Sequence, residues 1–155
     1  MTDWGTEEYE VYEVSGATLQ DVADAISGMP EAGKCEWLSS YSYDCGDGNT
    51  IVSATATVVI KITMPSWADS DSASPEAQAE FKRWWDALLA HENGHREIAE
   101  RHLDGIENGM VGKTPSEAAD YWTAQHAELQ RLSDEYDSRN NHGISEGTTL
   151  DTSIQ

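Results

Sequence analysis

The clearest pattern along the chain is an alternation of apolar and polar residues over 51–64. Apolar side chains occupy every second position, and threonines and Lys61 fill most of the positions between them. A period of two residues is typical of a β-strand with one buried face, so we expect a long strand here, ended by Pro65. Segments of similar character predict strands over 8–14 and 35–43, with a turn at 44–49, which is rich in Asp and Gly.

Three segments carry helix-start signals. Thr18, with Asp21 three residues later, resembles a capping box, and the helix behind it should stop near 28–30. Ser74 followed by Pro75 opens a second helix, which we expect to run to about 108–109. A third helix should start at 114–117 and end near 137–138.

The order of these elements predicts the fold class. One strand and a short helix are followed by two more strands and then by two long helices. We expect a single α+β domain over 1–155, in which a small antiparallel sheet packs against the two long helices. Its core should span about 8–147, with Trp84 and Trp85 buried in it, and the polar tail after 147 should be loose.

The second predicted helix carries the sequence His91-Glu92-Asn93-Gly94-His95, an H-E-x-x-H motif. Two histidines four residues apart lie on one helix face, about 6 Å apart along the axis, and can bind one metal ion. Glu92 is then placed as the general base of a zinc-dependent peptidase. Gly94 costs helix stability, so we expect it to allow the close approach of another segment.

A catalytic zinc ion needs a third protein ligand, and the spacing leaves several candidates. His102 lies about 10 Å beyond the motif along a straight helix, so it should be a surface or rim residue. Glu117 can bind the ion or close a capping box with Thr114. His126 lies among polar residues and should be solvated. His142, which precedes a glycine after the last helix, can fold back onto the site.

The charge of the chain limits the classes of molecule that it can bind. With 29 acidic and 9 basic residues, the chain has a net charge of −20, which argues against nucleic acid and anionic membranes. The same charge suits a protein adapted to high salt. The sequence has no membrane-spanning run and no signal peptide at its start. We therefore expect an intracellular or particle-associated protein, or a secreted one if a leader has been removed.

The two cysteines, Cys35 and Cys45, lie close to the predicted turn. They can form a disulfide or remain free, half-buried thiols, and their spacing alone does not decide between the two. The spacing is not that of a zinc-binding cysteine pair.

Two segments together resemble a known family. Residues 90–99, around the H-E-N-G-H motif, and a later Y-D-x-x-x-x-H-G element at 136–143 are similar to the bacterial family called domain of unknown function 922 (DUF922), the predicted secreted zinc-dependent proteases. With weaker similarity in the strands, the resemblance covers most of residues 9–147. This chain departs from the family pattern at Asn140, where the family has Thr, and in lacking an export leader.

The resemblance implies a zincin-like peptidase that holds one zinc ion through His91, His95 and His142. A water molecule activated by that ion would attack a peptide carbonyl of a peptide or protein substrate. Glu92 would take the proton of this water and pass it to the leaving amine. Neither the cleavage preference nor the oligomeric state can be read from the sequence.

Two further residues of the second element have expected roles. Tyr136 can hydrogen-bond the oxyanion formed during hydrolysis, or it can simply pack at the helix end. Asp137 can orient a ligand imidazole, or it can be a solvated residue at the helix end. The competing function is a non-catalytic, zinc-stabilised domain that binds a partner or forms part of a larger particle.

Overall fold

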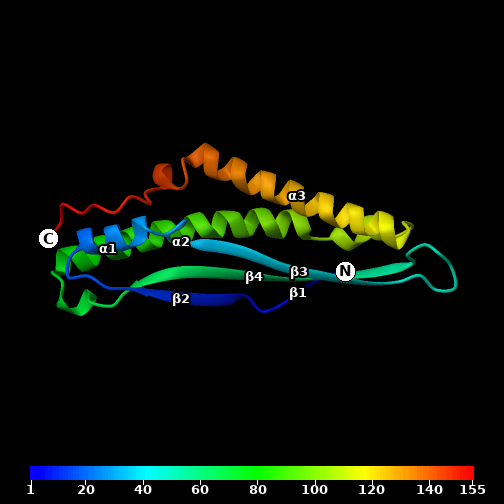
Figure 1. Cartoon of the computed structure of the whole chain (residues 1–155), viewed down its shortest axis with the longest axis horizontal. Coiled ribbons are helices and arrows are strands. Elements are labelled where there is room, and N and C mark those ends of the chain that lie inside the picture. Colours follow the sequence, from blue (N-terminus) through cyan, green and yellow to red (C-terminus); the bar gives the residue numbers. More distant parts are fainter.

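β4 (Ser53–Trp67) is the central strand of the sheet in the computed structural model, which describes residues 1–155 (Figure 1). β3 (Lys34–Asp44) pairs with β4 in antiparallel direction along one edge. Along its other edge, β4 pairs in parallel with β1 (Thr2–Trp4) and β2 (Glu8–Val14). The sheet is therefore mixed, and the prediction of an antiparallel sheet is wrong.

The connections between the strands explain this mixed sheet. β3 and β4 are joined by a hairpin, which makes them antiparallel. Between β2 and β3 the chain passes through α1 (Leu19–Ser27), and this longer connection lets β2 run in the direction of β4. β1 has three residues, too few for an alternation to be recognised in the sequence.

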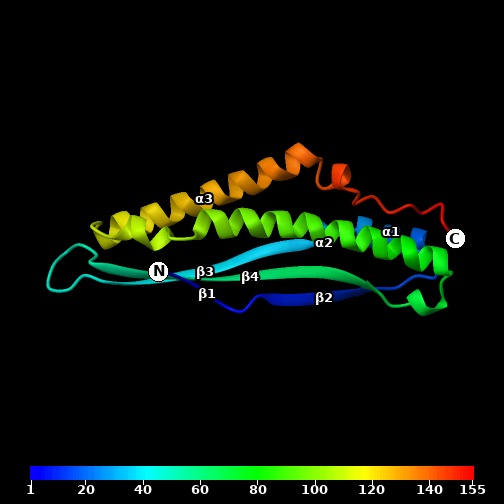
Figure 2. The same cartoon turned by 180° about the vertical axis from the view of Figure 1, so that it is seen from behind.

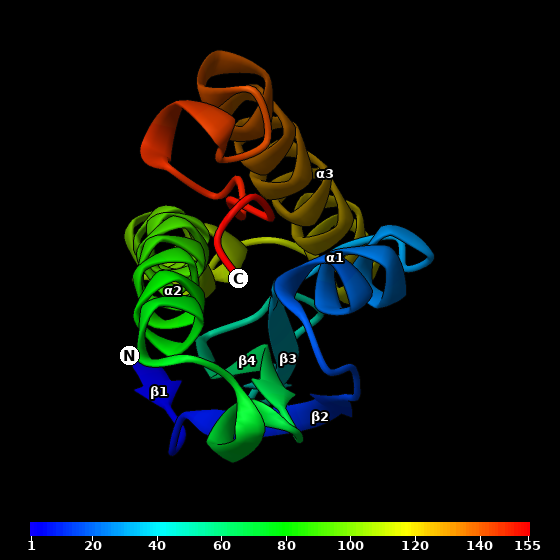
Figure 3. The ribbon, with the colours of Figure 1, turned by 90° about the vertical axis from the view of Figure 1, so that its left-hand side faces the viewer.

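Two long helices, α2 (Pro75–Leu103) and α3 (Pro115–Asn140), lie on one side of the sheet, and the molecule is elongated along them (Figures 1 and 2). α2 packs against β3 and β4, and α3 packs against α2 and, through Trp122 and His126, against β3. The end view in Figure 3 shows α1 on the same side of the sheet as α2. Short 3-10 turns occur at Ser70–Ser72, Ile106–Met110 and Ile144–Glu146. The α+β class is confirmed.

The core lies between β4 and α2, as the alternation over 51–64 requires. Every second side chain of β4 from Ala56 to Met64 is buried, whereas the threonines and Lys61 between them are not. These residues pack against apolar side chains of α2, which include Trp84, Leu88, Ala99 and Leu103. This packing fixes the rotation of α2 about its axis.

The helix-start signals are confirmed, but two helix ends differ from the prediction. Capping boxes open α1 and α3, and Ser74 caps α2. α2 ends at Leu103, earlier than expected, because Gly105 takes a left-handed conformation with a φ of 76° and turns the chain. α3 continues to Asn140.

The residues after Gly147, which we expected to be loose, lie along α2 (Figure 2). The carbonyl of Thr148 accepts a hydrogen bond of 3.0 Å from the indole of Trp84. Leu150 packs against two of the hydrophobic clusters. The tail is polar in sequence, but its contacts with α2 are specific.

Two other expectations concern the cysteines and the membrane. Cys35 and Cys45 are free, half-buried thiols, so no disulfide joins them. None of the helices combines the length and the apolar character that a membrane span needs.

Candidate metal centre

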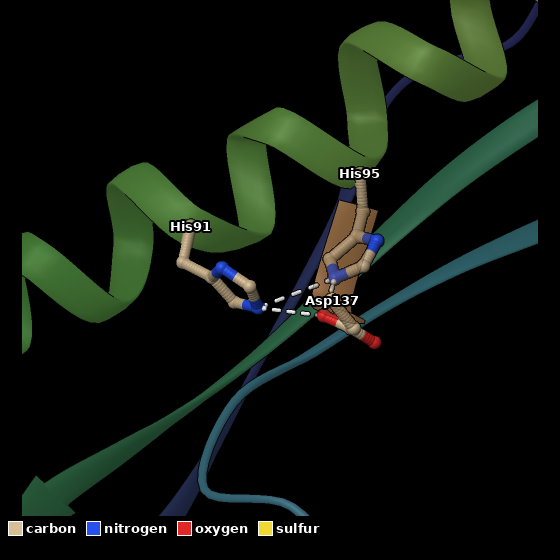
Figure 4. A group of neighbouring side chains, drawn as sticks. All are labelled: His91, His95 and Asp137. Carbon is tan, nitrogen blue, oxygen red and sulfur yellow. Dashed lines mark hydrogen bonds and ion pairs between the residues drawn. The ribbon is translucent and has the colours of Figure 1, made fainter. Parts of the chain in front are cut away.

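His91 and His95 lie one turn apart on α2 and point into the same space (Figure 4). Both residues are buried, with exposed fractions of 6% and 7%. Their Nε2 atoms are 3.3 Å apart. The two imidazoles of the H-E-x-x-H motif therefore converge, as predicted from their spacing.

Asp137, in the last turns of α3, brings a carboxylate to the same point. Its Oδ1 atom lies 3.2 Å from Nε2 of His91 and 3.0 Å from Nε2 of His95. His91, His95 and Asp137 thus form a group of three ligand atoms that face one another and could hold a metal ion. The sequence left Asp137 as either a residue that orients a ligand imidazole or a solvated residue at the helix end, whereas the structure places it in contact with both imidazoles.

The distances and the hydrogen bonds fit a metal ion. Two ligand nitrogens, each about 2.0–2.1 Å from a tetrahedral zinc ion, are themselves about 3.3 Å apart. In its neutral form the imidazole of His91 has one N–H, which lies on Nδ1, because a carboxylate oxygen of Glu146 accepts 2.7 Å from that atom. The lone pair of Nε2 then faces Oδ1 of Asp137, one acceptor against another. A cation between them removes this repulsion.

Outer hydrogen bonds hold both imidazoles by their other nitrogen. Oε2 of Glu146 binds Nδ1 of His91, and the hydroxyl of Ser133 binds Nδ1 of His95 at 2.8 Å. Burial lowers the pKa of His95, although the nearby Asp137 acts in the opposite direction. The neutral imidazole that a metal requires is thereby favoured.

Tyr136 packs against the rings of both histidines and hydrogen-bonds Glu146. Its ring stacks on that of His91, with centroids 5.2 Å apart and an interplanar angle of 17°. Its hydroxyl donates to Oε1 of Glu146 at 2.8 Å. Burial and this hydrogen bond raise the pKa of the Tyr136 hydroxyl. A Cβ atom at Gly94 would overlap the Tyr136 hydroxyl, so Gly94 allows the close approach that we predicted.

Glu92 is buried next to the three ligand atoms but is not one of them. Burial raises its pKa to about 8, with contributions from the nearby carboxylates of Glu31 and Asp137. Gly33 lies against this side chain, since a Cβ atom there would be 2.8 Å from Oε1 of Glu92. The carboxyl group is therefore enclosed between α2 and the loop that leads into β3.

A cavity of about 610 Å³ opens over the site. One wall is formed by residues 30–38, which lead into β3 and form its first half, and the other by α2 and α3. β3 pairs with β4 alone, so its second edge has no strand partner. The cavity therefore joins the histidines and Glu92 to a free strand edge.

His142 lines this cavity but is not in the group of three. Its side chain is 76% exposed, and its Nδ1 atom lies 3.9 Å from Oδ2 of Asp137. In this structure the third donor beside the two imidazoles is thus Asp137 and not His142. The expectation that His142 is a metal ligand rests on the family resemblance alone.

The other candidates lie away from the site. Glu117 closes the capping box of α3 with Thr114. Nε2 of His102 donates to the carbonyl of Gln125 at 2.9 Å. His126, which we expected to be solvated, is half-buried and hydrogen-bonds Ser39 of β3.

Sequence reasoning missed Ser133 and Glu146. Ser133 and Asp137 are four residues apart on α3, as His91 and His95 are on α2. This spacing places Ser133 and Asp137 on one face of α3, and it is the signal that could have revealed that both face the histidines. Glu146 had no such signal, because only the turn after α3 brings it to His91.

A family model described as "Bacterial protein of unknown function (DUF922)" matches residues 9–143. The chain belongs to the DUF922 family. No curated protein and no solved structure matches it. In this DUF922 protein the matched range includes His91, His95, Asp137 and His142, whereas Glu146 follows it.

Proposed function

We propose that this DUF922 protein is a zinc-dependent peptidase in which His91, His95 and Asp137 hold one metal ion. The observation that carries the proposal is the convergence of two Nε2 atoms and one carboxylate oxygen, with distances of 3.0–3.3 Å between them. A bound zinc ion would supply a Lewis acid that lowers the pKa of water and polarises a carbonyl group. The donor set suits zinc, which accepts nitrogen and oxygen ligands.

Glu92 would be the general base of this reaction. Its carboxyl group lines the cavity beside the ligands, and burial raises its pKa above the ordinary range of a glutamate, so it exchanges protons closer to neutral pH than an exposed carboxyl group does. It would take the proton of the attacking water and deliver it to the leaving amine. The oxyanion role predicted for Tyr136 requires its hydroxyl to leave Glu146, and it stays a prediction.

The free edge of β3 would bind the substrate. An extended peptide can add to an unpaired strand edge through main-chain hydrogen bonds. Residues 34–38 of this edge line the same cavity as Glu92. A peptide paired there would pass the ligand group along the strand. The substrate would thus be a peptide or an unfolded segment of a protein.

The second candidate is a metal-stabilised domain without catalysis. It is favoured by the position of Asp137, because an ion bound to His91, His95 and Asp137 would cross-link α2 to α3. Such an ion would stabilise the fold without any turnover.

Zinc titration and hydrolysis of a quenched peptide library separate these candidates. Glu92→Gln should bind zinc like the wild type and lose about 10²–10⁴-fold of the hydrolysis rate. A wild type that binds zinc and hydrolyses nothing supports the structural role, and a Glu92→Gln variant with full activity contradicts the mechanism.

The same titration identifies the third ligand. Asp137→Asn should weaken zinc binding strongly, whereas His142→Ala should leave it unchanged. The reverse result would assign the ion to His142. His102→Gln is the matched control, because His102 lies on α2 outside the ligand group.

A further inference from the structure

Each carboxylate oxygen of Glu146 accepts one hydrogen bond from a residue of the site. Oε2 accepts from Nδ1 of His91 at 2.7 Å, and Oε1 accepts from the hydroxyl of Tyr136 at 2.8 Å. Because the Tyr136 ring also stacks on His91, the imidazole is held both at its edge and on its face. Burial alone would raise the pKa of Glu146, but these hydrogen bonds lower it, which favours the carboxylate.

The turn that carries Glu146 is packed directly on His91. It is the 3-10 turn Ile144–Glu146, bounded by Gly143 and Gly147, both in the left-handed region with φ of 83° and 92°. A Cβ atom at Gly143 would be 3.2 Å from Cγ of His91. The backbone therefore approaches the imidazole closely, and it needs a residue that tolerates positive φ there.

The residues after this turn are fastened to α2. Arg83 donates to the carbonyls of Gly147 and Thr149, at 2.9 and 2.8 Å. Glu80, which is 7% exposed, forms an ion pair with Arg83 and accepts from the backbone N–H of Asp151 at 2.9 Å. Arg83 lies about two turns before His91 on the same helix, so the helix that carries the ligand also anchors the segment that holds it.

We propose that Glu146 is a positioning residue for the metal centre, supplied by a C-terminal segment, residues 144–155, that lies beyond the matched family range. Glu146 fixes the His91 proton on Nδ1 and aims the Nε2 lone pair at the space between His95 and Asp137. The role in metal binding rests on the proposed function above. The control of the His91 tautomer does not, because it belongs to the metal-free protein as well.

The test uses the full chain with Glu146→Ala and Glu146→Gln, and with Glu97→Gln as the matched control. Glu97 is an exposed residue of α2, and its substitution makes the same change in charge. Glu146→Gln keeps the size of the side chain and one acceptor oxygen. The readouts are the ¹⁵N shifts of the His91 ring without metal, zinc affinity by competition with a chelator, and the visible spectrum of bound Co²⁺.

In the metal-free wild type, at a pH where the ring is neutral, His91 should carry its proton on Nδ1. Glu146→Ala should move this proton to Nε2, weaken zinc binding about 10–100-fold and shift the Co²⁺ spectrum. Glu146→Gln should show a smaller loss, and Glu97→Gln none. If Glu146→Ala does not fold, Glu146→Gln decides through zinc affinity: a loss beyond that of Glu97→Gln supports the proposal, and wild-type affinity overturns it.

The proposal is overturned if Glu146→Ala keeps the wild-type tautomer of His91 and binds zinc with wild-type affinity. A loss of affinity without a tautomer change would also contradict it, because the effect would then not act through the His91 ring. If the wild type itself binds no zinc, the proposed function fails, while the tautomer of Glu146→Ala still decides whether Glu146 positions His91.

Discussion

The layer formed by α2 and α3 contains two regions with the same kinds of residues but different chemistry. The site end holds His91, His95, Gly94 and Tyr136, and the turn end, where α2 leads into α3, holds His102, His126, Gly109 and Tyr121. In both, a glycine lies against a tyrosine ring, and histidines occur on a long helix. At the turn end, three imidazole nitrogens are hydrogen-bonded: both nitrogens of His126, to Ser39 and a backbone carbonyl, and Nε2 of His102, to a backbone carbonyl.

At the site end only one nitrogen of each histidine has an outer partner. Nδ1 of His91 binds Glu146 and Nδ1 of His95 binds Ser133, which leaves both Nε2 atoms facing each other and Asp137. The comparison teaches that histidine count and helix position do not identify a metal centre. What marks a candidate metal centre is a set of possible ligand atoms that converge while hydrogen bonds to the other ring nitrogens hold the imidazoles.

The strongest way to break this comparison is to remove one histidine from each region. His95→Ala should weaken zinc binding by more than about 100-fold, the upper limit for losing an outer partner, because it removes a ligand itself. His126→Gln should leave the affinity unchanged, because neither nitrogen of His126 is free. Equal losses in the two variants, measured by chelator competition, would show that the two regions do not differ.

The two glycines allow a finer test. A methyl group at Gly94 would overlap Tyr136, and one at Gly109 would overlap Tyr121. Each Ala variant should therefore destabilise the protein by about 1–3 kcal/mol, measured by denaturant unfolding. Only Gly94→Ala should also weaken zinc binding, because a displaced Tyr136 loses its stack on His91 and its bond to Glu146. A similar loss of affinity in Gly109→Ala would contradict this.

The smallest expected effect concerns the C-terminal segment, residues 144–155, which packs at the site end and not at the turn end. Hydrogen bonds from Arg83 lower the pKa of Glu80, so its contribution to stability is present above its ordinary pKa and is lost as the pH falls through the lowered value. Glu80→Gln should therefore cost about 1–3 kcal/mol at pH 7 and less at pH 3, which is below the ordinary pKa of a glutamate. The free energy of unfolding at both pH values checks this. A difference that does not depend on pH would mean that the charge of Glu80 is not what stabilises the tail.

Local signals in the sequence predicted the elements but not how they meet. The alternation over 51–64 and the caps at Thr18, Ser74 and 114–117 correspond to features of the structure, because each depends on neighbouring residues. The parallel pairing of β2 with β4 depends on contacts between distant residues, so the sequence did not reveal the mixed sheet. The docked tail was missed for the same reason, since its partners Glu80 and Arg83 lie more than 60 residues away.

The candidate site shows the same division. The helical spacing placed His91 and His95 together, because their relation is local. Asp137 and Glu146 meet these histidines only through the packing of α3 on α2 and the turn after α3. The motif therefore predicted two of the three candidate donors, and the fold brought the third donor and the hydrogen-bond partner of His91 to them.

The most direct test of the account is anomalous diffraction at the zinc edge from crystals of the full chain grown with one equivalent of zinc. The account predicts a single peak within bonding distance of Nε2 of His91, Nε2 of His95 and Oδ1 of Asp137, about 2.0–2.2 Å from each. The absence of a peak there, or a peak at His102 or His126, would contradict it.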